Sequence, residues 1–162
     1  MNPDALSDLV LLAACAASAW WVAVGRAAWR GAMLLLGLAA AMGVLRYSGL
    51  EWALGPHRFF SLLAACVAFW LMVAALRWPQ APLARQATAV GRFVVLLGGL
   101  GIAASQVGAA WWAQVVPGLS ALVLAWTMVQ QRSALGILGS VALVASFVVA
   151  ALAAPDVQLL GM

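Results

Sequence analysis

The chain has 162 residues, of which 67% are hydrophobic and only 7% are charged, and its mean hydropathy is +1.10. Soluble globular domains carry about 25% charged residues, and a small one leaves a large part of its surface in water. Composition therefore excludes a soluble fold. It predicts an all-α, polytopic integral membrane protein for which the bilayer is the solvent.

The eight basic residues are all arginines and stand singly between apolar runs, giving a net charge of +4. Nucleic-acid binding usually requires basic residues clustered in one patch, so we expect no nucleic-acid partner. Scattered arginines instead mark the ends of membrane spans. The wealth of alanine, leucine, valine and arginine, with no lysine, indicates a GC-rich bacterial source.

A helix needs about 20 mostly apolar residues to cross the hydrocarbon core. Six stretches meet this need, and the short connections between them leave no room for a further domain, so residues 1–162 form a single transmembrane domain. The predicted spans are 7–25, 31–50, 58–76, 91–108, 112–131 and 133–154. The fold class is thus a compact bundle of six transmembrane helices.

Several residues mark the expected span boundaries. Ser7 or Asp8 is suited to cap the first helix, and Gly55-Pro56 marks a turn before the third. The uncharged stretch between Arg92 and Arg132 is too long for one span and must hold two. Pro117 is expected either in the break between these two spans or in the first turn or a kink of the fifth helix. Pro155 is expected to end the sixth.

The arginines are distributed unevenly between the two sides of the predicted bundle. Six of them, Arg26, Arg30, Arg77, Arg85, Arg92 and Arg132, fall in the first, third and fifth connections, and Arg46 and Arg58 fall on the opposite side. The positive-inside rule then predicts both termini outside a bacterial inner (plasma) membrane. Because the amino terminus lacks a basic n-region, the first apolar run is expected to be retained as a span.

Arg46 is the most informative polar residue, because the second helix reaches a spanning length only if it continues through Arg46 and Tyr47. Its Cα then lies about 6 Å below the membrane boundary. Two interpretations stay open: the side chain snorkels to water, or it pairs with Asp8 or Glu51. The second would form a polar mouth at the outer end, for which the ligand-binding candidates are Asp8, Arg46, Tyr47, Glu51 and His57.

Motifs for catalysis or metal binding are missing. A zinc site needs three or four ligands, and only His57, Glu51 and Asp8 could gather at one side. Cys15 and Cys66 each lie in the middle of an apolar run, where a thiol behaves as a small hydrophobe. We therefore expect no catalytic residue, no metal and no cofactor.

Small residues allow helix backbones to approach in lipid, where no hydrophobic force drives association. The candidate packing residues are Gly37, Gly43, Gly98, Gly101, Gly136 and Gly139. A short repeat accompanies them: residues 11–16 (LLAACA) recur as residues 62–67 (LLAACV), in the first and third predicted spans. Chance similarity and duplication of a helix hairpin both explain it.

The main functional hypothesis is a small, non-enzymatic membrane protein that binds a lipid-like or apolar ligand, or that acts as an accessory subunit of a membrane complex. Such a pocket needs only apolar walls and a polar mouth. A transporter or its substrate-binding membrane subunit is the alternative, and an intramembrane enzyme is the third. The expected partners are membrane lipid and either another membrane protein or a second copy of the chain.

Overall fold

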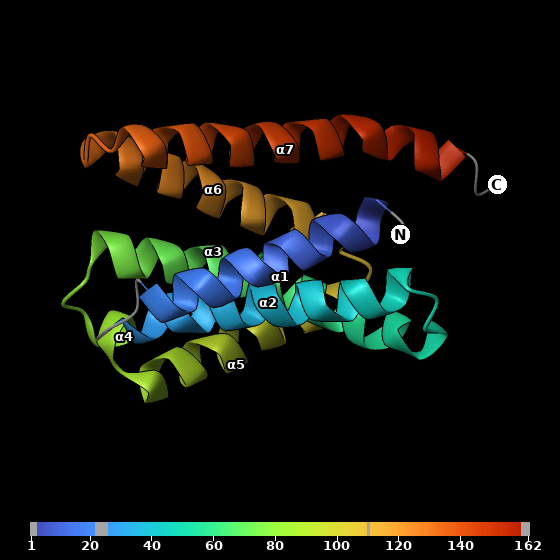
Figure 1. The fold of residues 1–162 in the computed structure, drawn as a ribbon, viewed down its shortest axis with the longest axis horizontal. Coiled ribbons are helices and arrows are strands. Elements are labelled where there is room, and N and C mark those ends of the chain that lie inside the picture. Colours follow the sequence, from blue (N-terminus) through green and yellow to red (C-terminus); the bar gives the residue numbers. More distant parts are fainter. Residues whose placement is uncertain (1–2, 22–25, 110, 160–162) are drawn as a thin grey trace.

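The computed structural model describes residues 3–21, 26–109 and 111–159, and this part of the chain is helical with no strand. Six long helices lie along the long axis of the molecule (Figure 1). They are α1 (Pro3–Trp21), α2 (Ala27–Tyr47), α3 (Leu54–Arg77), α5 (Ala87–Gln106), α6 (Trp112–Gln130) and α7 (Ala134–Leu159). The short helices η1 (Glu51–Ala53) and α4 (Pro82–Arg85) lie in two of the connections. The all-helical fold class is confirmed.

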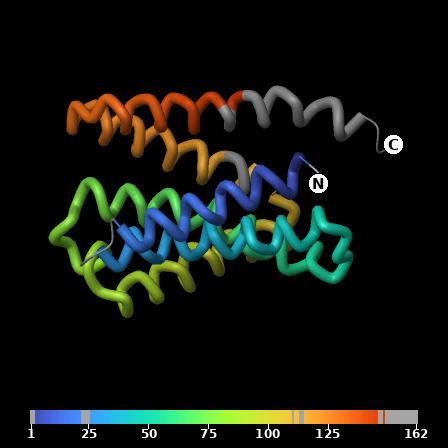
Figure 2. The backbone as a smooth tube through the Cα atoms, viewed as in Figure 1, coloured from blue at the N-terminus to red at the C-terminus, as the bar shows by residue number. Residues whose placement is uncertain are grey.

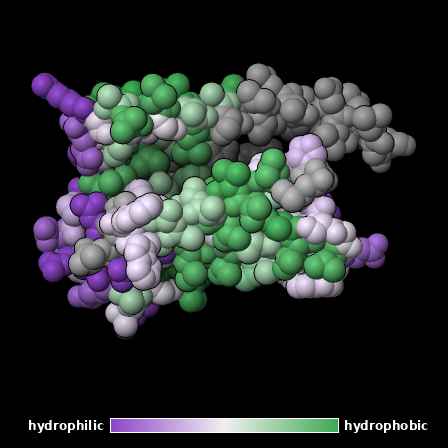
Figure 3. Space-filling model, viewed as in Figure 1, coloured by the Kyte–Doolittle hydropathy of each residue, from purple (hydrophilic) through white to green (hydrophobic). Residues whose placement is uncertain are grey.

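Four helical segments are long and apolar enough to cross a membrane: α1, α2, η1 with α3, and α5. In α6 and α7 the described apolar stretches, Val115–Gln130 and Ala134–Ala145, are shorter. The visible face of the molecule carries a broad apolar belt between hydrophilic ends (Figure 3). This distribution is that of a helical bundle surrounded by lipid.

Helix α3 lies at the centre of the bundle. It contacts α2, α5 and α6, whereas within the described residues α1 packs on α2 and α7 packs on α6. Its buried residues are mostly small or β-branched, including Ala64, Val67 and Ala75, so neighbouring backbones can approach it from three sides. The η1 turn and the start of α1 lie at one end of the bundle, and α4 lies at the other (Figure 2).

Several helices begin before their predicted starts. Helix α1 begins at Pro3, so Ser7 and Asp8 lie inside it, and the expected capping role is wrong; the Ser7 hydroxyl donates to the Asp4 carbonyl instead. Gly55 and Pro56 lie in the first turn of α3 rather than in a turn before it. Proline is tolerated there because a first-turn N–H has no intrahelical partner. The end of the first predicted span, residues 22–25, lies outside the described residues.

Helix α2 continues through Arg46 and Tyr47, as its length required, and is followed by Gly49 at φ 97°. Gly108, at φ 77°, makes the break between α5 and α6, and Pro117 lies inside α6. The prediction that Pro155 ends the last helix is wrong, because α7 runs to Leu159. Proline removes one backbone hydrogen bond but keeps a helical φ, so a helix can pass through it.

The two copies of the short repeat pack in the same way on the helix that follows each. In the first, Leu12 and Cys15 of α1 face Gly37 of α2. In the second, Leu63 of α3 faces Gly98 of α5, and Cys66 faces Gly101. The repeat therefore marks two helix pairs, α1–α2 and α3–α5, that use a leucine and a cysteine against glycine.

The last pair of predicted packing glycines behaves differently. A Cβ on Gly136 of α7 would overlap the sulfur of Met128 on α6, so this glycine permits close contact. Gly139 is exposed and has open space around it, which contradicts the expected contact there. The contact face of α7 runs instead through Gly136 and the buried Ser140, which are one helical turn apart.

Candidate functional site

The end of the bundle where η1 lies holds a polar cluster, which the first three helices form around Gly43 of α2. The Asp8 carboxylate from α1 lies so close that a Cβ on Gly43 would overlap Oδ2, and the Cβ would lie 3.2 Å from His57 Cε1 on α3. Within the described structure, Asp8 Oδ2 is buried and has no hydrogen-bond partner. Only glycine at position 43 leaves room for this approach.

His57 connects the cluster to the backbone of α2. Its Nδ1 lies 3.3 Å from the Ala39 carbonyl oxygen, and since a carbonyl only accepts, Nδ1 carries the proton of this hydrogen bond. The His57 ring meets Tyr47 edge-on at 6.0 Å, and the Arg46 guanidinium lies 5.0 Å from the centre of the Tyr47 ring. The latter contact has cation–π geometry.

Of the residues predicted to form the polar mouth, only some lie together in the structure. Arg46 is half-buried, but within the described residues it forms no ion pair with Asp8 or Glu51, so that predicted pairing is wrong. The Arg46 guanidinium lies over the Tyr47 ring instead, the Tyr47 ring faces His57, and Glu51 is exposed on η1.

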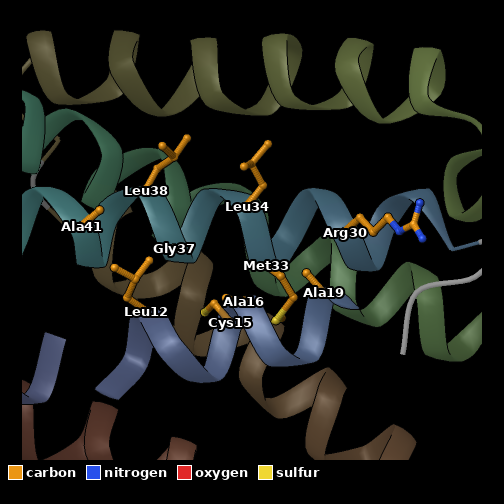
Figure 4. Close-up of a pocket in the computed structure, with 10 residues that line it drawn as sticks. All are labelled: Leu12, Cys15, Ala16, Ala19, Arg30, Met33, Leu34, Gly37, Leu38 and Ala41. Atoms are coloured by element: carbon orange, nitrogen blue, oxygen red, sulfur yellow. The ribbon is translucent and has the colours of Figure 1, made fainter. Parts of the chain in front are cut away.

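A second feature is an open groove of about 430 Å³ between α1 and α2 (Figure 4). Small residues of α1 form one wall and α2 supplies the rest. The lining residues are Leu12, Cys15, Ala16, Ala19, Arg30, Met33, Leu34, Gly37, Leu38 and Ala41. Leu34 and Leu38 point away from α1, and Arg30 stands at one end of the row (Figure 4).

The groove combines apolar walls with a single charged residue. Arg30 is its only charged lining residue, and it lies in the first turn of α2, at the end of the bundle opposite Asp8 and His57. Such a surface suits an amphipathic molecule that lies along α2 with its polar group at Arg30. The sequence analysis did not predict this groove, because small residues on α1 are the pattern expected both for a groove and for tight packing of two helices.

The structure also limits metal chemistry. Within residues 3–21, 26–109 and 111–159, no three His, Cys, Asp or Glu side chains gather where they could hold a metal ion. Cys15 and Cys66 are free and buried on different helices.

The chain is thus a helical membrane bundle with an open apolar groove between α1 and α2 and a polar cluster at the end of the bundle opposite Arg30. Comparisons with models of protein families, with curated proteins and with solved structures find no match.

Proposed function

We propose that this protein binds a lipid-like amphiphile, with the acyl chain in the α1–α2 groove. The observation that carries the proposal is the groove itself: apolar along its length, open at the side of the bundle and ended by Arg30. Its volume of about 430 Å³ lies within the range of about 300–1,000 Å³ typical of ligand sites. No catalytic group is assigned to it.

Exposure of the lining favours an occupant that comes from the membrane. Leu34 is 63% exposed although it lies in the middle of α2, and Ala16 of α1 is exposed beside it in the groove. Both residues lie within predicted spans, so their surroundings are hydrocarbon. A chain of the same chemistry can enter from the side without crossing a polar barrier.

We further propose six spans in a bacterial inner membrane with both termini outside. The support is the excess of arginine in the first, third and fifth connections, together with the up-and-down course of the six long helices. A reporter that is active only in the cytoplasm, fused after Met162, should be inactive. Full activity of that fusion would overturn the topology.

The ligand proposal is tested with a phospholipid that carries a photoactivatable group in the middle of one acyl chain. Irradiation with the full-length protein should attach the label to α1 and α2 residues of the groove. Ala16→Phe fills the groove and should lower labelling several-fold. Ala13→Phe is the matched control, because Ala13 is equally exposed on α1 but does not line the groove.

Two results would contradict this function. Equal labelling of the wild type and Ala16→Phe would show that the chain does not occupy the groove. A protein partner bound across α1 and α2 after mild solubilisation, with no lipid labelling, would support the accessory-subunit alternative instead.

A further inference from the structure

A second hollow of about 360 Å³ lies at the end of the bundle where Arg30 stands, between the beginnings of α2 and α5. Three arginines line it: Arg26, Arg30 and Arg85. Its remaining lining residues are Ala27, Gly31, Leu34, Ala87 and Val90. The charge around this hollow is therefore entirely positive.

The three arginines are not neutralised within the part of the chain that the structure describes. None forms an ion pair, and Arg85 donates only to the Gln80 side-chain oxygen, at 3.1 Å. Arg77, near the same end, does not line the hollow; its guanidinium donates to the Gln130 side-chain oxygen. Three cations around one hollow repel each other. An anion placed among them would be attracted to all three, so the electrostatic energy of the group would become favourable.

The backbone adds to the positive potential. Ala27 and Ala87 are the first residues of α2 and α5, and neither helix has a side-chain cap at its start. First-turn N–H groups lack intrahelical acceptors and carry partial positive charge, which attracts anions. Gly31 brings the helices together here, because a Cβ on it would lie only 2.8 Å from Val90 Cγ1.

The hollow and the α1–α2 groove are neighbours that share Arg30 and Leu34. A molecule with its anionic group among the three arginines can therefore extend its apolar part along α2 into the groove. Arginine's planar fork suits phosphate oxygens. Basic pockets between helices on the cytoplasmic side also fit lipid headgroups.

We propose that Arg26, Arg30 and Arg85 bind the phosphate of an anionic membrane phospholipid whose acyl chain occupies the α1–α2 groove. The acyl-chain part rests on the function proposed above. A zwitterionic headgroup such as phosphatidylethanolamine would bring an ammonium group among the arginines. The site therefore discriminates in favour of lipids with net negative charge, such as phosphatidylglycerol.

The test compares phosphatidylglycerol and phosphatidylethanolamine with identical acyl chains, bound to the full-length protein and measured by native mass spectrometry. Since three arginines near a membrane surface all favour an anionic lipid, we expect a preference for phosphatidylglycerol of about tenfold or more. The triple substitution Arg26→Gln, Arg30→Gln and Arg85→Gln should bring the preference close to one. Arg132→Gln, outside the hollow, should leave it unchanged.

Folding of the variants is checked by thermal unfolding. Arg85→Gln alone should still lower the preference several-fold, and this arginine is exposed on the short helix α4, so the single variant tests the proposal even if the triple one unfolds. Equal binding of both lipids to the wild type, or an unchanged preference in Arg85→Gln, would overturn it. Displacement of the lipid by millimolar glycerol phosphate would assign the site to a soluble phosphate instead.

Failure of this inference can be distinguished from failure of the proposed function. If Ala16→Phe weakens both lipids but the arginine variants change nothing, the groove binds acyl chains and the headgroup assignment is wrong. If the arginine variants abolish the preference but Ala16→Phe has no effect, the arginines select the headgroup and the chain lies elsewhere.

Discussion

The helix pairs α1–α2 and α3–α5 use the same short sequence but differ in the room that is left at the glycines facing it. On Gly98 a Cβ would overlap Leu63, and on Gly101 it would lie 2.7 Å from Cys66 Sγ, so α5 leaves no room beside α3. On Gly37 a Cβ would lie 3.6 Å from Leu12 Cδ1 and 3.7 Å from Cys15 Cβ, which is ordinary van der Waals distance. The α1–α2 pair therefore keeps space where the other pair has none.

The difference shows how one packing motif can close one helix pair and leave a groove beside the other. The closed pair joins the central helix α3 to α5; α3 supplies much of the buried cluster, and α5 adds Val90 to it. The open pair places α1 at the edge, against α2 and with its other faces exposed. Its groove is located where the glycine contact is loosest, and its close contact lies further along, where Asp8 meets Gly43.

The largest effect is expected when the closed pair is forced apart. Gly98→Leu adds a side chain where even a Cβ meets Leu63, so overpacking should cost about 3 kcal/mol of stability. Thermal unfolding in detergent measures this loss. Gly99→Leu is the control, since the neighbouring glycine is exposed and has nothing within 4 Å. Equal losses at both positions would mean that α5 is not held by this contact.

A smaller loss is expected where Asp8 of α1 meets Gly43 of α2. Gly43→Ala should cost about 2 kcal/mol because its Cβ displaces the Asp8 carboxylate. Combining it with Asp8→Ala should recover part of the loss, and a double-mutant cycle measures the coupling. Strictly additive losses would show that Asp8 does not lie against Gly43.

The next effect tests how the end of the bundle near η1 is held together. Arg46→Gln removes the cation–π contact with Tyr47, which should cost about 0.5–1 kcal/mol. An ion pair buried with Asp8 or Glu51 would instead cost about 3–5 kcal/mol when one partner is removed. Unfolding measurements on Arg46→Gln and Arg46→Lys separate the two cases. A loss of stability in the higher range would support an ion pair between Arg46 and a carboxylate.

The smallest effect is expected at the glycine of the open pair. A methyl group on Gly37 fits at ordinary contact distance, and alanine favours the helix over glycine, so Gly37→Ala should change stability by no more than about 0.5 kcal/mol. The same substitution at Gly43 serves as the comparison. If Gly37→Ala is as destabilising as Gly43→Ala, the α1–α2 pair is closed along its whole length and the groove does not exist in solution.

The sequence by itself determined the class of the fold and the course of its helices. Long apolar runs in a chain with so few charges allow only helices in lipid, because every backbone polar group must be satisfied within its own segment. The same reasoning required α2 to continue through Arg46. It also identified the repeat that marks the two helix pairs, and it gathered Asp8, Tyr47 and His57 at one end from their places near the helix ends.

Only the tertiary structure decided which side chains meet within those ends and which glycines are in contact. Helix rotation cannot be derived from a sequence that is apolar on nearly every face. The sequence therefore left open whether Arg46 pairs with a carboxylate, and it predicted contacts at both Gly136 and Gly139, of which the structure places only Gly136 against a neighbouring helix. The groove and the arginine hollow depend on the spacing between backbones. A Cβ on Gly37 would lie 3.6 Å from Leu12 Cδ1, whereas a Cβ on Gly98 would overlap Leu63, and this difference separates the open pair from the closed one.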